Sequence, residues 1–84
     1  MFDKIYEVTY YNGCEIRDMD LFTSLDLAVR CFLGYEKEAL ICEYRLKKGQ
    51  LLPTPLIERL PKGTYDYWGK TGEKIYNKIM ENKQ

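Results

Sequence analysis

The chain has 84 residues, of which 45% are hydrophobic and 31% are charged, with a formal net charge of zero and no histidine. This length supports one hydrophobic core, so we expect a single domain over residues 1–84. The composition is not that of a disordered chain, and no apolar run approaches the roughly 20 residues of a membrane-spanning helix. The first residues lead directly into a strand pattern, not a signal peptide, which predicts a soluble, cytoplasmic protein.

Charge is distributed unevenly along the chain. Residues 1–42 carry four basic and eight acidic side chains, whereas residues 43–84 carry nine basic and five acidic ones. Such a chain could pair with an oppositely charged partner, or head-to-tail with a second copy. Alternatively, folding brings the two halves together and the asymmetry cancels within one chain.

The three cysteines, Cys14, Cys31 and Cys42, are an odd number without CxxC spacing. A zinc site needs four ligands, which three thiols without histidine do not supply, so neither a metal nor a cofactor is expected. Cys31 falls near the C-terminal end of an expected helix, where the helix dipole does not activate a thiolate. Cys14 and Cys42 are expected on inward strand faces, so all three are predicted to be structural thiols.

The first expected element is a β-hairpin. Residues 4–11 alternate and are rich in β-formers, and the Asn-Gly pair at 12–13 is a strong hairpin signal. A three-residue turn with a bulge pairs Val8 with Ile16 and keeps one face apolar. A two-residue turn pairs Val8 with Arg17 and places charge on that face, so we favour the first register.

A short helix is predicted to follow and to lie across the hairpin. Thr23 and Ser24 are both suitable N-caps, Asp26 falls in the first turn, and Gly34 can end the helix. The apolar residues at helical spacing are Leu25, Ala28, Val29 and Phe32.

The rest of the chain is expected to add a strand, an extended segment and a second helix. Residues 38–47 alternate, and residues 48–50 suggest a turn. The prolines at positions 53, 55 and 61 favour an edge strand or an extended crossing over a central strand. Residues 71–81 have the apolar spacing of a helix. The apolar strand face holds Leu40, Cys42, Tyr44 and Leu46, and the helix stripe holds Ile75, Tyr76, Ile79 and Met80.

These elements predict an α+β fold in the order β-β-α-β-extended-α. The expected architecture is a small antiparallel sheet of three to four strands with two helices packed on one face. So small a sheet leaves an edge open, which the proline-rich segment could cover. Pairing of two copies through that edge would form a homodimer and add burial that a small core lacks.

Two familiar motifs fail on their spacing. The segment 69–71 (Gly-Lys-Thr) ends like a phosphate-binding loop, but five residues separate its first glycine from Gly63 where the motif has four. Glu15, Asp18 and Asp20 form an acidic cluster without the central glycine and closing glutamate of a calcium loop. This cluster indicates a solvated strand end or a docking surface for a basic partner.

Nothing in the sequence indicates catalysis. Glu36 and Glu38 fall in an expected loop with nothing to position them for acid–base chemistry. Without histidine or a cofactor motif, no thiol or carboxylate has an evident activating group. The chain is therefore predicted not to be an enzyme.

The most informative segment runs from residue 59 to residue 78, where basic and aromatic residues are interleaved. Tyrosine and tryptophan anchors surrounded by charge are typical of protein interfaces. The candidate partner-binding residues are Arg59, Lys62, Tyr65, Tyr67, Trp68, Lys70 and Lys74. These residues also suit single-stranded nucleic acid, although a pI of 6.2 argues against it. A third possibility is that Trp68 and one tyrosine fill the core beneath the second helix.

The sequence therefore predicts a non-enzymatic protein–protein interaction module that occludes or bridges a partner protein through this aromatic-basic surface. Small phage or mobile-element accessory proteins and inhibitors have this size, which is an analogy of size alone. The alternative is a nucleic-acid-binding regulator that uses residues 59–78. The two functions differ in salt dependence, because phosphate-driven binding weakens steeply as salt rises.

Overall fold

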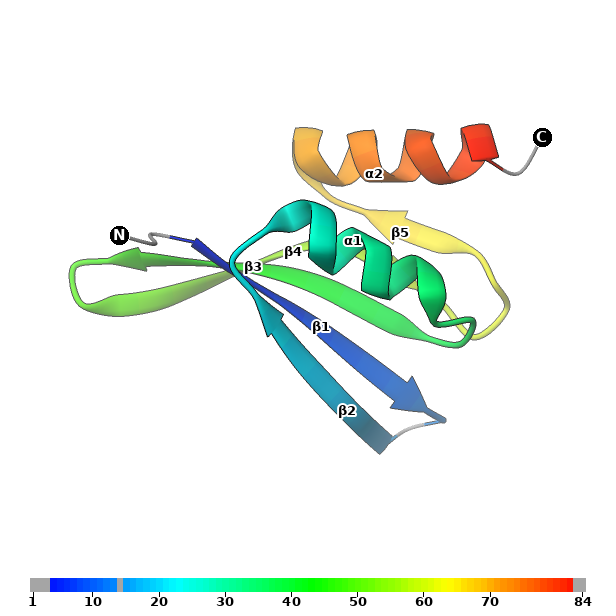
Figure 1. The fold of residues 1–84 in the computed structure, drawn as a ribbon, viewed down its shortest axis with the longest axis horizontal. Coiled ribbons are helices and arrows are strands. Elements are labelled where there is room, and N and C mark those ends of the chain that lie inside the picture. Colours follow the sequence, from blue (N-terminus) through cyan, green and yellow to red (C-terminus); the bar gives the residue numbers. More distant parts are fainter. Residues whose placement is uncertain (1–3, 14, 83–84) are drawn as a thin grey trace.

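A computed structural model describes residues 4–13 and 15–82 and shows an α+β fold with a five-stranded antiparallel sheet and two helices (Figure 1). The strand order in the sheet is β2-β1-β3-β4-β5. The elements are β1 (Lys4–Asn12), β2 (Glu15–Phe22), α1 (Leu25–Gly34), β3 (Ala39–Lys47), β4 (Gln50–Arg59), β5 (Tyr65–Tyr67) and α2 (Gly69–Asn82). The α+β class, the antiparallel sheet and the two helices are confirmed, but the sheet has more strands than the three or four predicted.

The additional strands come from the proline-rich segment and from the aromatic segment that follows it. Strand β4 pairs with β3 along its whole length, with Pro53 opposite Tyr44 and Pro55 opposite Cys42. Strand β5 pairs only with residues 57–59 of β4. The two prolines therefore lie where β4 has a neighbour on one side only, which is where a residue without an N–H group is tolerated.

The predicted register of the first hairpin is wrong. Val8 pairs with Asp20 and not with Ile16. The pairing extends to Asn12 opposite Glu15, so the turn lies further along the chain than residues 11–13, and β2 contains a bulge at Arg17. Cys14, which was expected on an inward strand face, lies outside the described residues. The prediction assumed that a buried face fixes the register, but β2 is an edge strand whose residues are nearly all exposed.

The hydrophobic core lies between one face of the sheet and the two helices. Helix α1 packs over β1 and β3, and α2 packs over β4 and β5 (Figure 1). The buried core residues are Tyr6, Val8, Tyr10, Ala28, Phe32, Ala39, Ile41, Leu56, Ile57, Ile75 and Ile79. No helix among the described residues is long and apolar enough to span a membrane.

Strand β3 presents the opposite face to the helices from the one predicted. Ala39 and Ile41 point into the core, so Leu40 and Cys42 lie on the other face of the sheet. Both faces of β3 carry apolar side chains in its first half, so alternation alone does not distinguish them. Cys42 is nevertheless buried, at 7% exposure, by its neighbours on that face.

Local signals identified the N-cap of α1, the turn between β3 and β4 and the apolar stripe of α2. The Ser24 hydroxyl accepts a hydrogen bond from the backbone N–H of Leu27 at 3.4 Å and caps α1. Lys48 and Gly49 both adopt positive φ (53° and 77°), which is the geometry of a two-residue hairpin turn between β3 and β4. Ile75 and Ile79 of α2 are buried as its apolar stripe predicted.

Because Tyr10 is buried, the free energy of unfolding is expected to fall at alkaline pH. Burial and then the hydrogen bond from the Tyr10 hydroxyl to Asp20 (3.0 Å) raise the pKa of Tyr10 far above its usual value. The unfolded chain loses this proton near pH 10, so the stabilisation is complete below that pH and declines as the pH rises further. Unfolding by urea at a series of pH values should show this decline, and Tyr10→Phe should make it shallower. Equal slopes for both proteins would contradict this assignment.

Candidate protein interface

Arg59, one of the candidate partner-binding residues, is buried, at 6% exposure, and holds the C-terminal end of α1. Its guanidinium donates hydrogen bonds to the backbone carbonyls of Phe32 (3.1 Å), Lys37 (2.9 Å) and Tyr35, and to the Tyr65 hydroxyl (3.0 Å). It also lies 4.4 Å from the centre of the Phe32 ring. In this conformation the guanidinium is not accessible to a partner.

The three aromatic candidates differ in exposure. The Tyr65 ring is half-buried, between Phe32 and Tyr76. Tyr67 is 41% exposed and stacks on Tyr76 of α2, with ring centres 4.8 Å apart. Trp68 is also 41% exposed, and its backbone N–H donates to the carbonyl of Leu56 at 3.0 Å. The aromatic segment therefore helps to attach α2 to the sheet and leaves Tyr67 and Trp68 partly accessible.

The three lysine candidates are exposed but occupy different parts of the fold. Lys62 lies in the turn between β4 and β5, whereas Lys70 and Lys74 lie on α2. Only Lys74 borders a groove, which α1 and α2 form between them. The predicted surface is thus divided between the β5 edge and the helices.

A larger apolar surface lies on the face of the sheet opposite the helices, which we call the open face. Strand registers place the following side chains on it: Ile5, Glu7, Thr9, Tyr11, Ile16, Met19, Leu21, Leu40, Cys42, Tyr44, Leu46, Leu51, Pro53, Pro55, Glu58 and Asp66. No described element covers this face. Its most exposed apolar side chain is Leu21, at 65%, and Ile16, Leu46 and Leu51 are each more than half exposed.

The charged groups of the open face are all acidic among the described residues. Glu7 accepts hydrogen bonds from the hydroxyls of Thr9 and Tyr44, both at 3.3 Å. Burial, and then the nearby carboxylates Glu58 and Glu7, raise the pKa of Tyr11. The open face is therefore an apolar surface with a negative potential.

Strand β2 forms one edge of the sheet and is paired on one side only. Met19 and Leu21 extend the open face to this edge, while Asp18 and Asp20 lie on the helix side. An edge strand of this kind exposes backbone groups to strand addition. Pairing of two β2 strands would bring these aspartates of both copies together, so their charge disfavours edge-to-edge association with a second copy.

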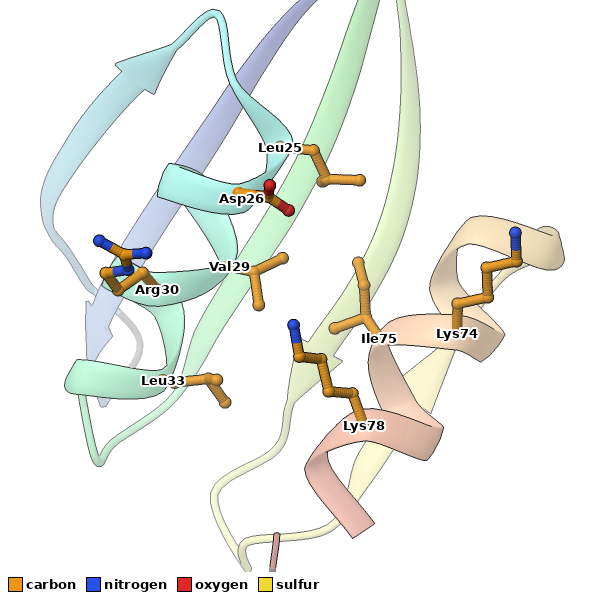
Figure 2. A pocket seen from close by; sticks show the side chains of 8 residues that line it. All are labelled: Leu25, Asp26, Val29, Arg30, Leu33, Lys74, Ile75 and Lys78. Carbon is orange, nitrogen blue, oxygen red and sulfur yellow. The ribbon is translucent and has the colours of Figure 1, made fainter. Parts of the chain in front are cut away.

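The groove between α1 and α2 has a volume of about 400 Å³ (Figure 2). Its apolar lining consists of Leu25, Val29 and Leu33 from α1 and Ile75 from α2. Its charged lining consists of Asp26 and Arg30 from α1 and Lys74 and Lys78 from α2. The groove is thus apolar along its floor and carries three basic groups and one acidic group at its rim.

The described residues form no cluster of three or more histidine, cysteine, aspartate or glutamate side chains that could hold a metal ion. Cys31 and Cys42 are free thiols. Burial, as the largest effect, raises the pKa of Cys42, which keeps this thiol protonated and unreactive.

Comparison with known proteins adds no relative: no protein-family model, no curated protein and no solved structure matches the chain.

Sequence reasoning missed the open face and the groove. The alternation of residues 38–47 identified an apolar strand face but did not show that the helices cover the other side. Leu33 continues the i, i+4 line of Leu25 and Val29, which is the one local signal of the groove. Its other wall lies more than 40 residues away in the sequence, so no local pattern brings the two walls together.

Proposed function

We propose that the chain is a non-enzymatic protein–protein interaction module whose partner covers the open face of the sheet. The observation that carries this proposal is the exposure of apolar side chains from β2, β3 and β4 on one uncovered face. Large exposed apolar patches on small proteins mark interaction sites, because leaving them in water is costly. The partner's contacting surface is apolar, with basic groups opposite Glu7 and Glu58.

Tyr67, Trp68 and the nearby lysines supply a second contact region at the β5 edge, as the sequence analysis proposed. Both residues are partly exposed, and amphipathic aromatic side chains are frequent interface anchors. A module of this kind acts by covering or bridging its partner, which is the action of a small inhibitor or accessory protein. Binding of nucleic acid by the same lysines remains the alternative.

A capture experiment with matched leucine variants tests the proposal. Leu21→Ser removes the most exposed apolar side chain of the open face, and Leu27→Ser makes the same change on α1, away from this face. Tagged wild-type protein and both variants, each verified as folded by circular dichroism, are incubated with lysate of the source cells with and without nuclease. We expect wild type and Leu27→Ser to recover the same protein and Leu21→Ser to recover at least about fivefold less, since burying a leucine contributes about 1.5–3 kcal/mol.

Each other outcome has a definite meaning. Recovery that disappears with nuclease would support the nucleic-acid alternative, and equal recovery by Leu21→Ser would contradict binding through the open face. Trp68→Ala, in the same experiment, reports whether the β5 edge contributes. Sedimentation of the purified proteins completes the test: a wild-type dimer that Leu21→Ser converts to a monomer would identify a second copy as the partner.

A further inference from the structure

The groove between α1 and α2 presents a continuous line of apolar side chains. Leu25, Val29 and Leu33 follow one another at i, i+4 and i+8 along α1 and point towards α2 (Figure 2). At a rise of 1.5 Å per residue, this line is about 12 Å long, which corresponds to roughly two turns of helix. Ile75 of α2 closes the floor from the other side.

The two walls of the groove differ in charge. On α2, Lys74 and Lys78 are one turn apart and both are exposed, so this wall is entirely basic. On α1, Asp26 and Arg30 are also one turn apart and carry opposite charges. In Figure 2 the Lys78 side chain extends into the space between the helices. An occupant therefore meets apolar side chains below and a positive potential on the α2 side.

We propose that this groove binds an acidic amphipathic helix of a partner protein, with its apolar residues on the floor and its carboxylates beside Lys74 and Lys78. Amphipathic helices bind apolar grooves in this way through residues at i, i+3, i+4 and i+7. This proposal does not depend on the proposed function, because the groove and the open face lie on opposite sides of the sheet.

Two observations favour a helix over other occupants. The walls are helices, whose backbone groups are already paired, so an extended peptide would find no backbone partner for its N–H and C=O groups that face the groove, whereas a helix pairs them internally. A second copy of the chain is also unsuitable, because neither of its described helices is acidic: α1 carries one acidic and one basic side chain, and α2 carries more lysines than glutamates. The occupant is therefore a helix from another protein.

The test uses a labelled synthetic amphipathic helix about 14 residues long, with leucines on one face and glutamates on one flank. Fluorescence anisotropy measures its binding to wild type and to Lys74→Glu/Lys78→Glu. We expect the charge reversal to raise the Kd of the glutamate probe roughly tenfold or more. A probe with lysines in place of the glutamates should show the reverse preference and bind the charge-reversed protein better.

Two matched controls separate the groove from general effects. Lys47→Glu/Lys62→Glu makes the same change in net charge at exposed sites outside the groove and should leave the Kd within about twofold of wild type. Leu33→Ala should weaken binding, whereas Leu27→Ala, an exposed leucine on the other side of α1, should not. All four variants are first verified as folded by circular dichroism.

Three results would overturn the proposal. The first is that neither probe binds the wild-type protein at millimolar concentration. The second is that both charge-reversed proteins lose the glutamate probe to the same extent, which would indicate a nonspecific response to net charge. The third is that laurate, tested in parallel, binds in a manner sensitive to Leu33→Ala while the helical probe does not, which would make the occupant a fatty acid.

Discussion

Replacing Gly72 by alanine is expected to destabilise the protein by about 2–3 kcal/mol, although alanine is the better helix former. Gly72 is buried where the first turns of α2 cross β4. A Cβ atom at this position would overlap the backbone carbonyl oxygen of Leu56, and it would also lie 3.3 Å from the Cβ of Tyr67. The Leu56 carbonyl cannot retreat freely, because it accepts the hydrogen bond of the Trp68 N–H at 3.0 Å. Relieving the overlap therefore requires α2 to move away from the sheet.

Urea unfolding followed by circular dichroism measures this loss, and the melting temperature should fall by about 10 °C or more. Gly34→Ala is the matched control, because Gly34 is also helical and an added Cβ there meets nothing within 4 Å. That variant should be as stable as wild type or slightly more stable. If both glycine variants unfold alike, α2 does not approach β4 as closely as described.

The close contact between Gly72 of α2 and β4 also affects the candidate interface at the β5 edge. Tyr67 ends β5 and Trp68 connects β5 to α2, so their exposure depends on the position of α2 against the sheet. Gly72→Ala should therefore disturb any binding through the β5 edge more than binding through β2, at the far edge of the sheet. The stability measurement and the capture experiment together separate these two regions.

Features encoded by neighbouring residues could be predicted from the sequence. Ser24 caps α1, the Lys48-Gly49 turn joins two strands, and the apolar stripe of α2 is buried, because each depends on residues within a few positions. The proline-rich segment was predicted to be an edge strand or an extended crossing, and it forms β4, with β3 on one side and the short β5 on the other. A proline is excluded only where its N–H would have to pair with a neighbouring strand, and at positions 53 and 55 β4 has a neighbour on the β3 side only.

Features that depend on distant residues could not be predicted. The register of β2 depends on a bulge at Arg17, which the residue pattern of a mostly exposed strand does not fix. Which face of β3 points into the core depends on where α1 packs, since Ile41 and Leu40 are equally suited to a core. For the same reason the open face, and the groove between helices distant in sequence, became visible only in the folded chain.

Arg59 is the clearest case, since the sequence placed it among partner-binding residues and the fold gives it an internal position. The last turn of α1 contains no basic residue, so the helix has no cation of its own near its C-terminal carbonyls. Arg59, on β4, supplies that charge and donates to the carbonyls of Phe32, Tyr35 and Lys37. The planar guanidinium suits this role because it can donate several hydrogen bonds at once from one fixed geometry.

Arg59→Met is therefore expected to cost about 3 kcal/mol or more, because it removes the hydrogen bonds that a buried guanidinium donates to these carbonyls and to the Tyr65 hydroxyl. Arg59→Lys keeps the charge but can reach fewer carbonyls at once, so it should restore less than half of the loss. Urea unfolding measures both variants, and Arg30→Met, at an exposed position on α1, is the control that should change stability by no more than about 0.5 kcal/mol. If Arg59→Met instead leaves the protein as stable as the control but abolishes capture of the partner, then Arg59 acts at the interface and not as the cap of α1.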